Sequence, residues 1–167
     1  MEWLTLIQKC FFFGLAATGF AILFAVPART LLPVFIMGAL GGITKFILLH
    51  YHFNIIVSTL VGSAVIGFLS IPFAHFRHAP PAIFAIPAVI PMVPGVLAYK
   101  MMSGLIVLAS DANPALHTAM LADTVHYGLQ VMFILISLAV GVELPLLITR
   151  KQSAKGLIKR SAYKDLA

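Results

Sequence analysis

The chain has one cysteine, few charged residues and no nucleotide-binding motif. Because Cys10 has no second cysteine as a partner, an intrachain disulfide is excluded, and we expect Cys10 to be a packing residue. Only 10% of the residues are charged, whereas soluble domains carry about 25%. The absence of a G-x-x-x-x-G-K-[ST] loop argues against direct use of ATP by this chain. The histidines have no carboxylate or thiolate partner at metal-ligand spacing, so we expect neither a metal nor a cofactor.

Apolar residues dominate instead. They make up 61% of the 167 residues, and the mean hydropathy is +1.05. Since a membrane-spanning helix needs about 20 apolar residues, the sequence predicts an all-α, polytopic membrane protein with about five transmembrane helices. The predicted spans are residues 4–26, 31–49, 54–73, 80–109 and 116–148. We expect the first span to be a retained helix ended by Pro27, because no A-x-A cleavage site follows it.

The positive charges predict how the spans are oriented. Six of the eleven Lys and Arg residues lie in residues 150–167, which we interpret as a basic cytoplasmic tail after a transmembrane domain of residues 1–149. With five spans, Arg29 and Arg77 fall on the same side as this tail. The prediction is a periplasmic amino terminus and a cytoplasmic carboxyl terminus. The net charge of +6 is therefore a topology and lipid-headgroup signal, and no nucleic-acid partner is expected.

Three prolines interrupt the fourth predicted span. Pro87, Pro91 and Pro94 fall within eight residues and are followed by Gly95. A proline has no N–H and clashes with the preceding helical turn, so this segment is not expected to form an unbroken helix. In hydrocarbon, irregular backbone is tolerated only where protein or a wet cavity covers it. The alternatives are a substrate-binding break in the span and a plain proline kink, and a re-entrant pair of helices would place both termini on one side.

The break is predicted to place free backbone carbonyl groups next to free backbone N–H groups. In helical geometry the three prolines leave the carbonyls of Ile83, Pro87 and Ile90 without their usual partners. Pro94 suits the first turn of a new helix, whose N–H groups from Gly95 through Leu97 would point toward the break. Such a pair of groups suits a zwitterion such as an amino acid, or a carboxylate.

Two lysines lie within predicted spans. Lys100 follows Tyr99 one turn after the break, and it either faces a cavity and attracts an anion or extends toward the outer interface. Lys45 lies near the outer end of its span, where we expect its side chain to extend toward the interface. We take Tyr99 and Lys100, together with Pro87, Pro91, Pro94 and Gly95, as candidate substrate-binding residues.

The last span carries two carboxylates, Asp123 and Glu143, and a histidine, His126, close to the first of them. Asp123 and His126 are three residues apart and share a helix face, so they are candidates for proton coupling or substrate contact. The alternative is that Asp123 lies near the outer interface, because this span is longer than the bilayer requires. We expect Glu143 to lie near the inner interface and to pair with a basic residue.

Small residues cluster in the second and third spans. They are Gly38, Ala39, Gly41, Gly42, Ser58, Gly62, Ser63 and Gly67. This spacing lets helix backbones approach closely, either within the chain or at an interface with a second subunit. Since many secondary transporters are built from two related halves, five spans suit one such half.

The stretch Ile86-Pro87-Ala88-Val89-Ile90-Pro91-Met92-Val93-Pro94-Gly95, followed by Tyr99, resembles the signature of the threonine/serine exporter family. In length and span order the chain resembles the family's short five-helix half, which also occurs as a separate small subunit. The resemblance implies a proton-driven exporter of the bacterial inner membrane. It also implies a larger homologous subunit that supplies the other five helices. Amino acids such as threonine and serine and dicarboxylates such as succinate both occur as substrates among relatives.

We therefore expect a small subunit of a secondary exporter for small carboxylates or amino acids, and not an enzyme. Three alternatives remain open: a non-transporting scaffold or assembly subunit, a passive channel, and a membrane-embedded enzyme. An enzyme would need a polar catalytic cluster at one depth, and only Asp123 with His126 approaches this.

Overall fold

The computed structural model describes the backbone of residues 3–110 and 114–164 and the side chains of residues 4–110 and 118–149. Across these residues the regular structure is entirely helical, which confirms the predicted all-α class. The elements are α1 (Trp3–Leu23), η1 (Ala28–Thr30), α2 (Leu31–His50), α3 (Ile55–Arg77), α4 (Pro81–Val89), η2 (Ile90–Met92), α5 (Gly95–Ser110) and α6 (Pro114–Lys164).

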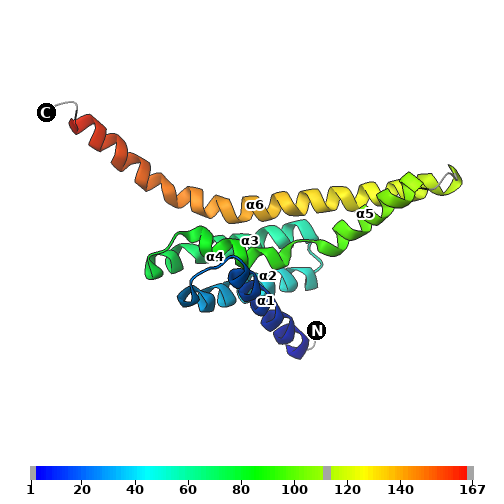
Figure 1. Ribbon diagram of the computed structural model, residues 1–167, viewed down its shortest axis with the longest axis horizontal. Coiled ribbons are helices and arrows are strands. Elements are labelled where there is room, and N and C mark those ends of the chain that lie inside the picture. The colour runs from blue at the N-terminus through cyan, green and yellow to red at the C-terminus, as the bar shows by residue number, and fades with distance from the viewer. Residues whose placement is uncertain (1–2, 111–113, 165–167) are drawn as a thin grey trace.

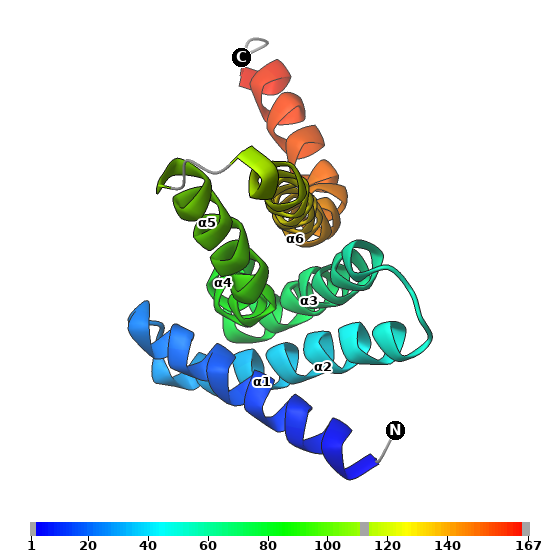
Figure 2. The ribbon, with the colours of Figure 1, turned by 90° about the vertical axis from the view of Figure 1, so that its right-hand side faces the viewer.

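The long helices pack side by side in the order α1, α2, α3, α6, α5. α1 packs on α2, α2 on α3, α3 on α6 and α6 on α5, while α4 contacts α1, α2 and α3 (Figures 1 and 2). The largest fully buried side chains include Phe84, Met37, Ile66 and Met92, so the core lies where α4 and η2 meet α2 and α3. The broken segment thus packs mostly against protein.

In the described part of the chain, four helices are long and apolar enough to cross a membrane: Leu4–Leu23, Ala28–His50, Ile55–Arg77 and Thr118–Thr149. The pair Pro81–Met92 and Gly95–Ser110 gives a fifth span if it is taken together, with a bend of 56° between its two parts. α4 and α5 continue in one general direction (Figure 1), whereas a re-entrant loop would turn back. The structure therefore confirms a broken fourth segment and favours one bent span.

The spans alternate in direction. The turn after α1, the turn between α3 and α4 and the C-terminal part of α6 lie toward the left of Figure 1, and the turn between α2 and α3 lies toward the right. Arg29 and Arg77 belong to these left-hand segments, so they lie at one end of the bundle, as predicted.

Several helix ends differ from the prediction. α1 ends at Leu23, not at Pro27, because Ala25 adopts a left-handed conformation (φ 53°) and the N–H of Val26 donates to the carbonyl of Ala21 at 3.0 Å. α3 continues past residue 73 to Arg77 and contains Pro72. α6 also begins earlier and extends much further than residues 116–148, because its backbone stays helical to Lys164.

The glycines of α2 are used within the chain. A Cβ atom at Gly38 would lie 2.6 Å from the Cβ of Ala17, and one at Gly42 would lie 2.8 Å from the ring of Phe13, so both glycines face α1. Gly41 faces α3 and η2 instead. Glycines on two sides of α2 therefore let it approach two neighbours closely.

The same holds where α3 meets α6. A Cβ atom at Gly67 would lie 2.8 Å from the carbonyl oxygen of Val142. The hydroxyl of Ser63 donates to the carbonyl of Ser137 at 3.2 Å, and a Cβ atom at Gly141 would collide with Ser63. Of the two alternatives for the small residues, the structure shows internal packing.

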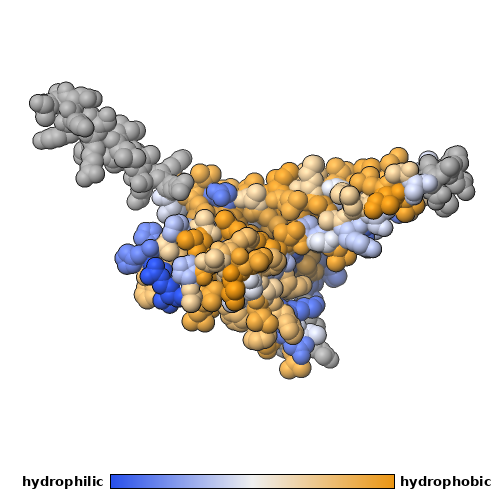
Figure 3. Space-filling model, in the orientation of Figure 1, coloured by the Kyte–Doolittle hydropathy of each residue, from blue (hydrophilic) through white to orange (hydrophobic). Residues whose placement is uncertain are grey.

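The outer surface is largely apolar. Figure 3 shows apolar residues over most of the central part of one face, with hydrophilic residues mainly toward its left edge and lower right. Exposed apolar side chains occur on all the long helices, among them Leu15, Phe68, Ile106 and Leu144, which are 51%, 58%, 61% and 50% exposed. Such a surface suits lipid or another membrane helix rather than water.

Candidate substrate site at the break in the fourth span

The three prolines occupy different positions at the break. Pro87 is buried inside α4, Pro91 lies in η2, and Pro94 directly precedes the first residue of α5. Gly95 opens α5 with nothing within 4 Å of where a Cβ atom would lie. The prediction that these residues interrupt the helix is therefore confirmed. The 3₁₀ turn of η2 is the local structure that accommodates them.

Two groups that the sequence predicted to be free are paired. The carbonyl of Ile90 accepts a hydrogen bond from the N–H of Val93 at 3.0 Å, and the N–H of Gly95 donates to the carbonyl of Val93 at 2.9 Å. The predictions for Ile90 and Gly95 are wrong because tight turns satisfy these groups locally. The N–H groups of Val96 and Leu97 have no hydrogen-bond acceptor among the described residues. They are the free donors at the start of α5.

Lys45 reaches the break from α2. Its side chain is only 8% exposed, and its Nζ atom donates to the carbonyl oxygen of Met92 at 3.2 Å. The prediction that Lys45 extends toward the interface is wrong. Instead this residue directs a buried positive charge at the backbone of η2.

Two glycines make room for this contact. The Cε atom of Met92 would lie 2.9 Å from a Cβ atom at Gly41 and 3.1 Å from one at Gly62. A Cβ atom at Gly62 would also lie 3.4 Å from the Cβ of Lys45. The side chain of Met92 is 1% exposed and fills the space between α2 and α3, while its carbonyl accepts from Lys45. The sequence held a signal for this arrangement, since Gly41 and Lys45 are four residues apart and share a face of α2.

A cavity of about 300 Å³ lies between α5 and α6, one turn beyond the break. It is lined by Tyr99, Lys100, Ser103, Gly104, Met120, Asp123, Thr124 and Tyr127. The cavity brings together three of the candidate residues, Tyr99, Lys100 and Asp123, all of which are exposed. The positive side chain comes from α5 and the negative one from α6. The Nζ atom of Lys100 lies 5.3 Å from the centre of the Tyr127 ring, which holds the ammonium over the aromatic face.

The remaining candidates do not line this cavity. His126 is exposed, and its ring lies 6.0 Å from that of Tyr127. Although Asp123 and His126 are neighbours on α6, only Asp123 lines the cavity with Lys100. Pro87 instead lines a separate, mainly apolar cavity of about 320 Å³ beside Phe24 and Ile86.

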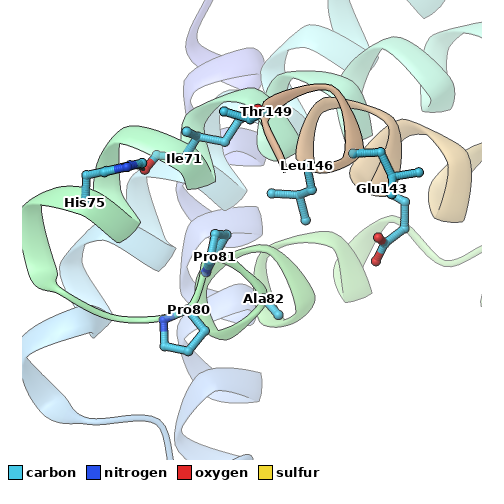
Figure 4. A pocket seen from close by; sticks show the side chains of 9 residues that line it. Ile71, His75, Pro80, Pro81, Ala82, Glu143, Leu146 and Thr149 are labelled. Carbon is cyan, nitrogen blue, oxygen red and sulfur yellow. Dashed lines mark hydrogen bonds between the residues drawn. The ribbon is translucent and has the colours of Figure 1, made fainter. Parts of the chain in front are cut away.

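A further cavity of about 410 Å³ lies at the opposite end of the bundle, where α3, the start of α4 and α6 meet (Figure 4). Glu143 and His75 lie at its two ends, and Leu146 lies between them. The structure shows no basic residue within ion-pairing distance of Glu143 among the described side chains. The expected pairing is therefore absent from that part of the chain.

Comparison with known proteins gives two findings. The family described as "Threonine/Serine exporter, ThrE" matches residues 9–148 of this chain. A Haemophilus influenzae protein described as uncharacterized is 35% identical over 150 residues, which cover 89% of this chain and 49% of that protein. The chain thus spans about half the length of this relative. No solved structure matches the chain.

Proposed function

The chain belongs to the threonine/serine exporter family, and on this premise we propose that it is one half of a secondary exporter for small carboxylates or amino acids. The observation that carries the proposal is the bent fourth span, with the Lys100 and Asp123 cavity directly beyond it. In transporters, such breaks supply the backbone groups that bind the substrate.

The chemistry of the cavity favours a zwitterion over a neutral solute. The ammonium of Lys100 matches a carboxylate, and the carboxylate of Asp123 matches an ammonium. Two hydroxyl side chains, Ser103 of α5 and Thr124 of α6, also line the cavity and suit a hydroxylated amino acid such as serine or threonine. A dicarboxylate such as succinate would use Lys100 and would need a further positive group.

A second, larger membrane subunit is part of the proposal. The relative from Haemophilus influenzae is about twice as long as the region that it shares with this chain. The helices of this chain also carry many exposed apolar side chains, which another helix bundle or lipid would cover. The functional unit is then a pair of halves packed around the broken spans, as in transporters built from repeats.

The remaining parts of the proposal concern location and energy source. The protein resides in the bacterial inner membrane, with its amino terminus in the periplasm and the residues 150–167 in the cytoplasm, in accordance with the positive-inside bias. Export is driven by the proton gradient. Asp123 is the first candidate for the proton carrier because it shares the cavity with Lys100, and His126 is the second.

Flux from proteoliposomes tests the proposal. Vesicles that contain this chain and its larger subunit, loaded with serine, threonine or succinate, are compared with vesicles that contain either chain alone. We expect flux only from the pair and only under a proton gradient, with loss of flux when an uncoupler is added. Undiminished flux with the uncoupler would support a passive channel, and flux from this chain alone would refute the half-transporter assignment. Absence of flux from every combination would favour a scaffold subunit.

A further inference from the structure

Lys45 is a buried cation without a counterion in the described part of the chain. It is 8% exposed, and the carbonyl oxygen of Met92 is its one hydrogen-bond acceptor among the described residues. An ammonium group has three N–H donors. The only two carboxylates with described side chains, Asp123 and Glu143, lie on α6 and line cavities that do not include Lys45. A buried charge without a counterion is costly, and a bound anion would offset that cost.

The surroundings of Lys45 indicate where that anion would lie. Val93, the residue after Met92, is 45% exposed, and open space surrounds Gly95. The N–H groups of Val96 and Leu97 are free at the start of α5, within five residues of Met92. A 16-residue helix with free N–H groups at its start attracts negative charge. The segment that follows Met92 therefore offers backbone donors that suit a carboxylate.

We propose that the ammonium of Lys45 binds the carboxylate of the transported molecule at the break. The carboxylate then replaces the carbonyl of Met92 as the hydrogen-bond acceptor of Lys45. The proposal rests on the proposed transport function. It adds to that function a second positive group, which lies on α2, whereas Lys100 lies on α5.

The side chain of Met92 fills the space beside Lys45. Its Cε atom fills the space between Gly41 and Gly62, and its carbonyl accepts from the ammonium. If η2 moves away from α2, the space between Gly41 and Gly62 and the ammonium of Lys45 become available together. Methionine suits this exchange because its side chain is flexible and adapts to different surroundings.

The test measures the difference between an acid and its amide. The full chain is purified with the subunit that accompanies it, and thermal-shift titrations give apparent Kd values for succinate, succinamide, L-serine and L-serinamide. Lys45→Met removes the charge at similar size, and Lys45→Gln is a second neutral variant in case the first does not fold. Lys9→Met is the matched control, because Lys9 is exposed on α1 and lies over the Phe46 ring at 5.1 Å.

We expect the wild-type protein and Lys9→Met to bind each acid more tightly than its amide. In the Lys45 variants the Kd of the acid should rise roughly 10- to 100-fold while that of the amide stays unchanged, as for loss of a hydrogen bond to a charged group. A merely structural role would weaken acid and amide alike. Equal acid affinity in wild type and Lys45→Met, or no acid preference in the wild type, would overturn the proposal. If the acid preference depends on Lys45 but proteoliposomes transport none of these compounds, the transport function fails and the binding site stands.

Discussion

Replacing Gly67 with alanine should loosen the contact between α3 and α6, on which the packing of the last span depends. A Cβ atom at Gly67 would lie 2.8 Å from the carbonyl oxygen of Val142 and 3.0 Å from both the carbonyl oxygen of Gly141 and the Cγ of Pro145. Two of these three atoms belong to the backbone of α6, which cannot rotate away as the end of a side chain can. The two helices must therefore move apart.

The expected magnitude follows from two opposing effects. Overpacking a well-packed site costs about 1–3 kcal/mol, and we expect the upper part of this range because backbone atoms are involved. Alanine regains about 1 kcal/mol over glycine through helix propensity. The net loss is then about 1–2 kcal/mol, which corresponds to a drop in Tm of about 2–8 °C if this chain responds as soluble domains of similar size do.

Gly19 provides the matched control for the same substitution. A Cβ atom at Gly19 would meet nothing within 4 Å, so Gly19→Ala should leave Tm unchanged or raise it slightly. Both variants and the wild type are purified in detergent, and Tm is measured from the fraction that remains monodisperse after heating. If Gly67→Ala melts at or above the temperature of Gly19→Ala, the close approach of α3 and α6 is wrong.

Two further predictions concern function. Gly41→Ala should push Met92 out of its place between Gly41 and Gly62 and so lower the flux per assembled complex. The abundance of the complex should change little, because the colliding atoms belong to side chains. Vesicle flux normalised to immunoblotted complex measures both quantities, and a fall in abundance alone would favour the scaffold alternative. Asp123→Asn should abolish the dependence of flux on the proton gradient, whereas His126→Gln should leave most of it intact, because only Asp123 lines the cavity with Lys100. Flux measured at several imposed pH gradients compares the two variants, and the opposite order would assign the proton to His126.

Residue types predicted the break but not its hydrogen bonds. Pro87, Pro91 and Pro94 exclude a continuous helix because each lacks a donor and fixes its backbone angle, and the structure is bent by 56° at that place. Whether a given carbonyl is free depends on the turn that forms there. In the η2 turn the carbonyl of Ile90 accepts from the N–H of Val93, and in a three-residue turn the N–H of Gly95 donates to the carbonyl of Val93. These short-range choices depend on how α4 and α5 are held by their neighbours, which sequence alone does not specify.

The position of the Lys45 side chain could not be predicted from its own span alone. On its own helix a lysine near the end of a span is expected to extend toward the interface, since this lowers the cost of its charge. The structure instead buries it, because Gly41 and Gly62 allow η2 to come close enough for the carbonyl of Met92 to accept from Nζ. Three segments separated in the chain must meet before this contact exists.

The sequence by itself determined the membrane class, a total of four or five candidate spans, the common end of the bundle for Arg29 and Arg77, and the position of the break. These properties follow from the apolar length of each segment, from the distribution of charge and from the covalent structure of proline, and none of them requires a partner segment. Only the tertiary structure decided which glycines pack against which helix, which lysine is buried, and that Lys100 and Asp123 share a cavity while His126 does not. Those outcomes depend on the distances between helices, which are set by packing of side chains from distant parts of the chain.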